Sequence, residues 1–410
     1  MLKKFFFLFF LCVLSVAGSP LLNPVQAQVA IKGETVHTMA GAPIKNGVVL
    51  IRDGKIEQVG PAEQVKIPTG YRTLSAKVVT PGLIDAHTVI GLSGYLNQPQ
   101  DQSQLDQSEA MQPELRAIDA YNAQERLVEW VRGFGVTTLH TGHGPGALIS
   151  GQTMIVKTTG DTVESALVNP TSMVAVTLGS GSLAREGKSP GTRAKQIALL
   201  RSELIKAQEY VTKRDTAPDD KKPARNLRME TLGQVIKGEL RLLVTVHRAE
   251  DILSALRVAK EFKVQIVLDG AAESYLVKDQ IKAAGVPVII HPTMFRSNGD
   301  TENLSMETAS ALRKAGIPVA LQSHFEGYVP KTRVVLFEAA VAAANGLSFE
   351  EALGTITIEA ARILGIANRV GSLEAGKDAD VVLFDGDPFE YASHTTGVVI
   401  NGKIVSEEAR

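Results

Sequence analysis

One feature constrains the fold more than any other: short apolar runs alternate with amphipathic stretches from Val78 to Ala367. This alternation is typical of parallel strands joined by crossover helices. Eight strand ends can be placed, and eight successive strands are what a closed (β/α)8 TIM-type barrel requires. We therefore predict an α/β fold with such a barrel over residues 81–367. The strand ends lie near His87, His140, Lys157, Leu178, His247, Asp269, His291 and His324.

The amphipathic stretches predict helices, which are clearest at 249–262, 272–284, 305–315 and 332–345. Two segments depart from the alternation, a Gln- and Asp-rich loop at 97–109 and a long charged stretch at 185–228. Because long loops are uncommon in compact domains, we interpret both as surface insertions. Residues 216–223 are where we expect proteolytic cleavage.

Both ends of the chain have β character. Near the start, two β-type runs are joined at Asp53-Gly54, which is a strong hairpin signal. Near the end, similar runs occupy 379–384 and 398–405. Because the termini of a domain often lie close together, we predict one small β-sandwich domain formed from residues 28–80 and 368–410.

Residues 1–27 have the features of a secretory signal peptide. Lys3 and Lys4 precede a largely apolar run at 5–17, and a polar stretch ends at Ala27, where cleavage is expected. The run is shorter than the roughly 20 apolar residues that span a bilayer. We therefore expect an exported protein, periplasmic or extracellular, that does not stay inserted in the membrane after cleavage. Retention of the segment as an anchor is the alternative.

Composition excludes several classes of function. The single cysteine, Cys12, lies inside the predicted signal, so disulfides, a cysteine nucleophile and thiolate zinc sites are excluded from the mature chain. The formal net charge is −1, from 43 Lys and Arg against 44 Asp and Glu. This balance gives no reason to expect binding to nucleic acid or to an anionic membrane.

Histidines gather where a barrel would carry its active site. Such sites form at the C-terminal ends of the strands. For any one histidine there, a satisfied core or loop position is an equally good interpretation. As a set they indicate a functional site. Six of the eight histidines lie at or just beyond predicted strand ends: His87, His140, His143, His247, His291 and His324.

Two motifs carry a family resemblance. The segment VTPGLIDAHT at 79–88 resembles the first barrel strand of the amidohydrolase superfamily, and RVGSLEAGKDADVV at 369–382 resembles that family's return into its sandwich domain. Residues 357–364 are similar to its last helix, and the imidazolonepropionase-like branch is nearest. The resemblance implies a divalent-metal hydrolase of carbon–nitrogen or related bonds, in which metal-activated water attacks a polarised carbonyl.

The first strands match the family's metal-ligand pattern only in part. His87 matches the first histidine of the pair expected on strand one, but Val89 stands in place of the second. On strand four, where the family has a lysine or glutamate, the sequence around Leu178 offers no ligand. His247 falls where the histidine of strand five is expected, so the resemblance implies His87 and His247 as metal ligands.

The sixth and eighth strands carry substitutions. Asp269 stands where the family usually has a histidine, and a carboxylate can also ligate a metal. The aspartate that usually ends strand eight, as ligand and general base, is missing, and His324 or Glu326 is the nearest titratable substitute. The resemblance thus implies catalytic roles for Asp269 and His324, with zinc as the expected divalent ion.

Three interpretations of this incomplete pattern stay open. The first is a rewired, mononuclear metal site, because three protein ligands plus water is the usual open catalytic arrangement. The second is metal-free hydrolysis with His324 or His247 as general base. The third is a catalytically inactive barrel that serves as an exported ligand- or protein-binding module, because a fold does not guarantee its chemistry.

Weaker candidates surround the predicted site. The glycine-rich loop at 140–152 lacks the Gly-Lys-Ser/Thr ending of a P-loop, so we reject nucleotide binding. We predict that His140, His143, Gln152 and Arg248 bind substrate; a tight rim turn and a helix-start ion pair are the alternatives. The expected partner is a small amide, cyclic amide or peptide-like molecule. A homodimer is common for such barrels.

Overall fold

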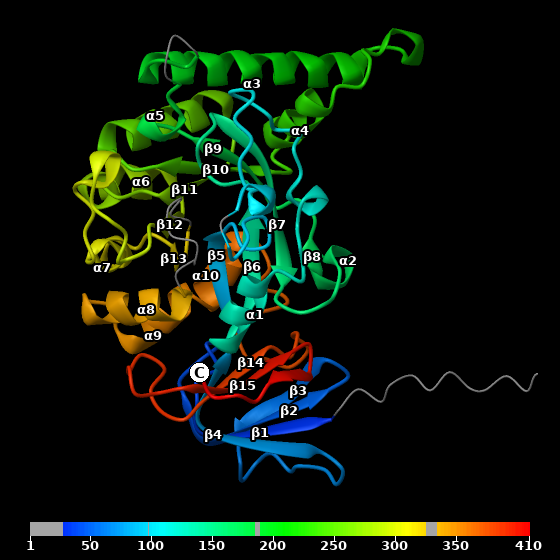
Figure 1. Ribbon diagram of the computed structural model, residues 1–410, viewed down its shortest axis with the longest axis vertical. Coiled ribbons are helices and arrows are strands. Elements are labelled where there is room, and N and C mark those ends of the chain that lie inside the picture. Colours follow the sequence, from blue (N-terminus) through cyan, green and yellow to red (C-terminus); the bar gives the residue numbers. More distant parts are fainter. Residues whose placement is uncertain (1–27, 97, 185–188, 325–333) are drawn as a thin grey trace, which may run out of the picture.

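The computed structural model describes residues 28–96, 98–184, 189–324 and 334–410. These residues form a β domain and a barrel, seen one below the other in Figure 1. The predicted signal peptide, residues 1–27, lies outside the described residues, as does Glu326. No helix in the described part of the chain is long and apolar enough to cross a bilayer.

The β domain is a seven-stranded sheet that takes strands from both ends of the chain. Its central junction is the antiparallel pair β4–β14, with Val381 opposite Pro81. The predicted composite β domain is therefore confirmed. In sheet order the strands are β16 (Lys403–Ser406), β15 (Thr395–Ile400), β14 (Val381–Phe384), β4 (Arg72–Pro81), β1 (Val29–Val36), β2 (Ile44–Arg52) and β3 (Lys55–Pro61).

The predicted hairpin is also confirmed. Strands β2 and β3 pair antiparallel, and Asp53 and Gly54 connect them with φ of 52° and 78°. Two successive left-handed residues match the right-handed twist of the flanking strands, which explains the preference for Asp-Gly at this turn.

Eight further strands form the barrel, which confirms the predicted (β/α)8 architecture. The sheet closes where Thr88 at the end of β5 bridges to His324, just beyond β13. Each strand ends within three residues of its predicted end. The strands are β5 (Leu83–Thr88), β6 (Val136–Gly142), β7 (Ile149–Lys157), β9 (Met173–Thr177), β10 (Arg241–Val246), β11 (Ile266–Gly270), β12 (Val288–Ile290) and β13 (Val319–Leu321), with β8 (Leu167–Asn169) beside β7.

One barrel strand runs the other way. β7 pairs antiparallel with both β6 and β9, so the expectation of eight parallel strands is wrong there. The reason is the connection, because residues 143–148 between β6 and β7 are too few for a crossover, which takes a dozen residues or more. Lys157 therefore ends at the opposite mouth of the barrel from His140.

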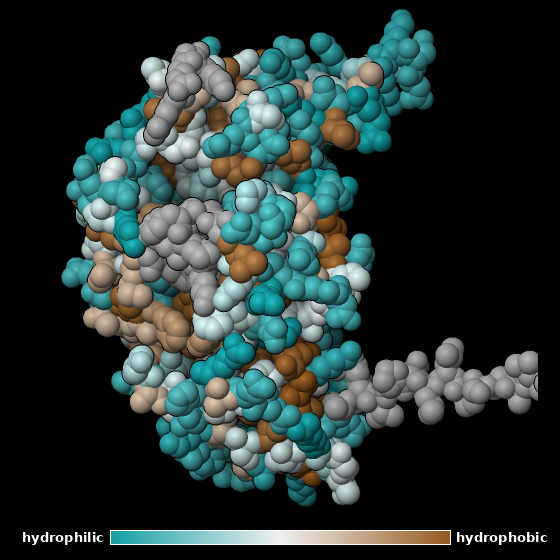
Figure 2. Space-filling model, in the orientation of Figure 1, coloured by the Kyte–Doolittle hydropathy of each residue, from teal (hydrophilic) through white to brown (hydrophobic). Residues whose placement is uncertain are grey.

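The predicted helices are present, and the longest helix in the described part of the chain was not among them. The charged stretch at 185–228, predicted as a surface insertion, contains the 24-residue helix α3. Its C-terminal end projects from the body and is mostly hydrophilic (Figures 1 and 2). The helices are α1 (Arg126–Gly133), α2 (Val163–Ala166), α3 (Arg193–Thr216), α4 (Leu227–Ile236), α5 (Ala249–Phe262), α6 (Lys278–Ala284), α7 (Thr308–Lys314), α8 (Val335–Ala344), α9 (Phe349–Thr355) and α10 (Ile358–Leu364).

A buried ion-pair cluster joins the barrel to the β domain. Lys157, at the end of β7 and 3% exposed, contacts Asp380 directly and Asp378 at 3.3 Å. Asp378 has two further partners, Lys55 at 2.7 Å and Arg369 at 2.9 Å. In the described residues, Lys157 is the only cation paired with Asp380. Because β7 runs antiparallel to its neighbours, its last residue, Lys157, lies at the end of the barrel that faces the β domain.

Replacing Lys157 with methionine should therefore destabilise the fold strongly. Breaking a buried pair by removing one partner typically costs about 3–5 kcal/mol, because the other charge stays buried. Lys55→Met is the matched control, since Lys55 is half exposed and such pairs contribute about 1 kcal/mol or less. Urea unfolding measures the free energy of unfolding of both variants. If the two variants lose equal stability, Lys157 is not the main counter-charge of a buried carboxylate.

Candidate functional site

Three side chains from different strands meet at the closure of the barrel. His87 lies in β5, Asp269 lies in β11 and His324 follows β13. All three are buried, and one donor atom from each lies within 4.8 Å of the others. His87 Nδ1 is 2.9 Å from Asp269 Oδ1, and the His324 amide donates to the His87 carbonyl at 3.2 Å. The barrel thus brings together three of the residues predicted to act in the site.

Asp269 is held as a carboxylate. Thr245 Oγ1 donates to Oδ2 at 2.5 Å, and Gln322 Nε2 donates to Oδ1 at 2.9 Å. Burial opposes ionisation, but the charge and hydrogen bond of His87 hold the pKa of Asp269 well below its usual range. A fixed negative charge therefore lies inside the barrel at the end of β11. The roles of Thr245 and Gln322 as its hydrogen-bond partners were not predicted from the sequence.

His87 is oriented by this carboxylate. Burial disfavours its protonation, but the charge of Asp269 outweighs burial and raises the pKa of His87. Because Nδ1 donates to Asp269, Nε2 is the remaining ring nitrogen, and it is buried with no hydrogen-bond partner among the described residues. A carboxylate–histidine pair of this kind fixes the tautomer and leaves Nε2 for a ligand.

His324 is held in an uncommon backbone conformation. Its φ is +54°, in the left-handed region that few residues other than glycine adopt. Burial lowers its pKa to about 3, so the imidazole is neutral over the physiological range. Backbone strain of this type collects at functional sites, where the surrounding structure maintains it.

Asp85 ties the first strand to the last beside the site. Its Oδ1 accepts the amide of Ser323 at 3.0 Å and that of His87 at 3.4 Å. Ser323 Oγ lies 3.1 Å from Thr88 Oγ1. Burial raises the pKa of Asp85 to about 7. Asp85 is therefore a positioning residue. It lies within the motif at 79–88, but the sequence analysis gave it no role.

His247 lies next to the three-residue group and not within it. Its ring packs on Gly270, where an added Cβ would lie 2.5 Å from Cε1. Phe295 stacks on it with ring centroids 6.5 Å apart and meets His324 edge-on at 5.5 Å. Nδ1 of His247 is buried without a hydrogen-bond partner in the described part of the chain. Its role as a metal ligand stays a prediction.

His291 is a further imidazole that was noted at a strand end but given no role. It follows β12, and its Nδ1 lies 2.7 Å from the carbonyl oxygen of Pro292, to which it donates. Nε2 is buried and has no partner among the described residues. Burial lowers the pKa of His291 to about 4, so this imidazole is also neutral.

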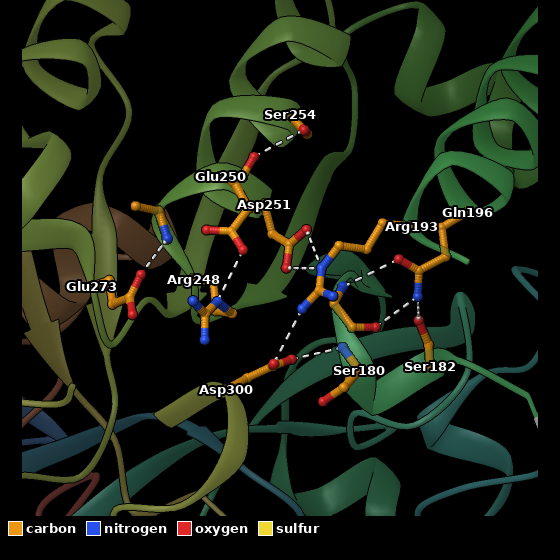
Figure 3. Close-up of polar contacts among 12 residues, drawn as sticks. Ser180, Ser182, Arg193, Gln196, Arg248, Glu250, Asp251, Ser254, Glu273 and Asp300 are labelled. Atoms are coloured by element: carbon orange, nitrogen blue, oxygen red, sulfur yellow. Dashed lines mark hydrogen bonds and ion pairs between the residues drawn. The ribbon is translucent and has the colours of Figure 1, made fainter. Parts of the chain in front are cut away.

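A network of polar contacts centred on Arg193 and Asp300 lies beside these residues (Figure 3). Arg193 of α3 donates to Asp251 at 2.9 Å and to Asp300 at 3.2 Å, and Asp300 accepts the amide of Ser180 at 2.6 Å. The insertion at 185–228 therefore fastens the loop that follows β12 to the loop that follows β9.

His140 has a structural role in this arrangement. Its Nδ1 contacts the Ala86 carbonyl at 2.7 Å and its Nε2 contacts Thr153 Oγ1 at 2.6 Å, with no exposed surface. Both ring nitrogens thus have partners within the protein, and the role of His140 in binding substrate stays a prediction. The sequence could not show this, because the partners lie on the neighbouring strands β5 and β7.

Of the other predicted substrate residues, Gln152 and Arg248 are engaged elsewhere, whereas the role of His143 stays a prediction. His143 is buried with its ring against Gly151. Gln152 donates to the Pro113 carbonyl and to Thr231, both at 3.0 Å. Arg248 pairs with Glu250 at 2.9 Å and Glu302 at 3.2 Å. The ion-pair alternative for Arg248 is the one that the structure shows.

The two positions that lack ligands in the sequence are apolar and buried in the structure. Val89 is 3% exposed and Leu178 is 4% exposed. Neither can bind a metal, so the donors available are those around His87. Neutral imidazoles and a carboxylate are the donors that zinc takes. The ionised Asp269 and the unpartnered Nε2 of His87 therefore fit a divalent ion at this group.

Comparisons with known proteins place this geometry in a family. The profile of the amidohydrolase family matches residues 78–405. An imidazolonepropionase of Rhizobium rhizogenes is 26% identical over 87% of this chain and 90% of its own length. A solved amidohydrolase from Thermotoga maritima is 28% identical, with a TM-score of 0.87 over 93% of this chain and all of the other.

A more distant structure shares the fold. A zinc-bound adenosine deaminase from Xanthomonas campestris has a TM-score of 0.57 at 17% identity, over 92% of both chains. The family match over most of the chain, the eight-stranded barrel and the buried His–Asp–His group agree with one another. The chain belongs to the amidohydrolase family and is a hydrolase of the type that acts on carbon–nitrogen bonds.

Proposed function

We propose that this hydrolase opens the carbon–nitrogen bond of a small cyclic amide or peptide-like substrate at a mononuclear divalent-metal centre, with zinc as the ion. The observation that carries the proposal is the buried group of His87, Asp269 and His324, whose donor atoms lie within 4.8 Å of one another. These residues would hold the ion, and His247 would lie beside it.

The substitutions on strands six and eight support a working site, because they compensate each other. The resemblance places a histidine on strand six and an aspartate on strand eight, whereas this chain has Asp269 and His324. One carboxylate and one imidazole are thus kept, in exchanged positions. The exchange preserves the number of donors and the local charge, which random loss of the two ligands would not do.

A divalent ion bound here would polarise a substrate carbonyl and lower the pKa of water. The protein groups supply orientation and proton handling. Asp269 accepts the Nδ1–H of His87 and would add its negative charge to the group of residues that holds the ion. Because the pKa of Asp269 lies so low, its carboxylate is a poor base, and the neutral imidazole of His247 beside the group, whose Nδ1 has no hydrogen-bond partner among the described residues, would accept the proton of the attacking water and pass it to the leaving nitrogen.

Phe295 defines the size of the substrate in this proposal. Its ring contacts both His247 and His324, and its loop is fastened by Asp300 to Arg193 and Ser180. An aromatic ring held over the imidazoles excludes water and offers a flat apolar surface. A small planar amide fits such a surface better than an extended chain does.

Metal content tests the centre directly. Purified protein should contain about one divalent ion per chain, and His87→Ala and His324→Ala should each lose most of it, because three protein ligands are the usual minimum. His394→Ala is the matched control, since this exposed histidine pairs with Asp385 in the β domain. Elemental analysis gives the count. Unchanged content in both site variants would place the ion elsewhere and defeat the assignment.

Asp269→Asn tests the carboxylate at nearly constant shape. The variant loses the charge that orients His87, and loss of such a partner typically lowers metal affinity or activity about 10- to 100-fold. The expected result is a fall in kcat/KM of at least that size, measured on the substrate selected from a panel of cyclic amides and dipeptides. Lys55→Met, remote from the site, should keep wild-type kcat/KM.

The inactive binding module is the second candidate, and the observation that favours it is the pair of apolar residues, Val89 and Leu178, at ligand positions. It predicts wild-type protein without metal and without turnover of any amide in the panel. The two candidates thus separate on the same two measurements.

A further inference from the structure

A groove of about 970 Å³ lies at the opposite end of the barrel from the histidines. It is lined by the C-terminal halves of α5 and α6, which are neighbours in Figure 1, and by the starts of β10 and β11. Arg241 is the first residue of β10 and Ile266 the first of β11, whereas His247 and Asp269 lie near the other ends. The groove is therefore separate from the catalytic centre.

The lining of the groove combines an apolar floor with cations. Leucine, isoleucine, valine, alanine and proline supply most of the residues, for example Leu253, Leu256 and Val286. Arg241, Arg257 and Lys260 supply three positive charges, and no aspartate or glutamate is among the lining residues. The volume is within the range of sites for small molecules, roughly 300–1,000 Å³.

The charge of Arg241 has no counter-charge. It is half-buried, and its Nη2 donates to the carbonyl oxygen of Ile363 at 2.6 Å, which is a neutral partner. Burial alone lowers its pKa. Within the described residues no ion pair is formed by Arg241, Arg257 or Lys260, and of the three only Arg241 is partly buried. An uncompensated guanidinium in an apolar groove is costly unless an anion joins it.

The ends of α5 and α6 explain part of this charge but not all of it. Cations near a helix C-terminus are favourable, which accounts for Lys260 in the last turn of α5. That effect falls off within one turn. Arg241 begins a strand, so it gains nothing comparable from its own element.

We propose that this groove binds a small amphiphilic carboxylate, with its aliphatic body on the apolar floor and its carboxylate between Arg241, Arg257 and Lys260. The guanidinium groups offer paired N–H donors that match the two oxygens of a carboxylate. The aliphatic residues provide the surface that an unbranched chain needs, and the groove keeps that chain out of water.

Sodium dodecanoate is the probe, titrated calorimetrically into full-length protein. The expected result is saturable binding of one molecule, with much weaker binding of sodium acetate, which lacks the tail, and of 1-dodecanol, which lacks the charge. Arg257→Gln/Lys260→Gln should weaken dodecanoate at least about tenfold, because hydrogen bonds to charged groups contribute more than neutral ones. Both residues are exposed, so this variant should fold normally.

Two further variants make the test specific. Ala284→Trp places a large side chain at an exposed position of the lining and should abolish binding. Lys32→Gln/Lys77→Gln removes two lysines from a different cavity, in the β domain, and should bind dodecanoate as the wild type does. The proposal is overturned by absence of saturable binding, by equal binding of dodecanol, or by affinity unchanged in the groove variants. A concentration-dependent dimer that Ala284→Trp abolishes would also overturn it, because the groove would then be a contact between copies.

Discussion

The structure depends on the contact that closes the barrel, where β5 meets the residue after β13. Asp85 accepts the Ser323 amide, and Thr88 bridges to His324. The same junction positions His87 against Asp269 at 2.9 Å. Closure and site assembly are therefore one event, because a barrel open at this seam would separate His87 from His324. Polar residues are costly to bury singly, and at this junction Asp85 and Thr88 are buried together with hydrogen bonds to Ser323.

Under the proposed function, the site keeps one carboxylate and one imidazole although several of the family's ligand positions differ in this chain. Val89 and Leu178 remove donors on one side, and the exchange of carboxylate and imidazole between β11 and the end of β13 keeps them on the other. Asp269 then serves two purposes, since it orients His87 and supplies the negative charge of the centre. A residue that carries two functions leaves little room for substitution.

Local sequence signals predicted much of this fold. The Asp53-Gly54 hairpin and helix α5 follow from turn chemistry and helical periodicity, and both are properties of neighbouring residues. The direction of β7 and the partners of His140 were not predictable in this way, because they depend on strands far apart in the sequence. His87, Asp269 and His324 could be named from motifs, but only the fold shows that His247 lies outside their group.

The sheet of the β domain has a consequence for the order in which the protein forms. β4 acquires its neighbour β14 only when Val381 is available to pair with Pro81, three hundred residues later in the chain. During synthesis the N-terminal strands therefore present an unpaired edge for as long as the barrel is being made. Such edges template association between chains. The long separation in sequence between β4 and β14 therefore prolongs the time for which an edge of the β domain is open to such association.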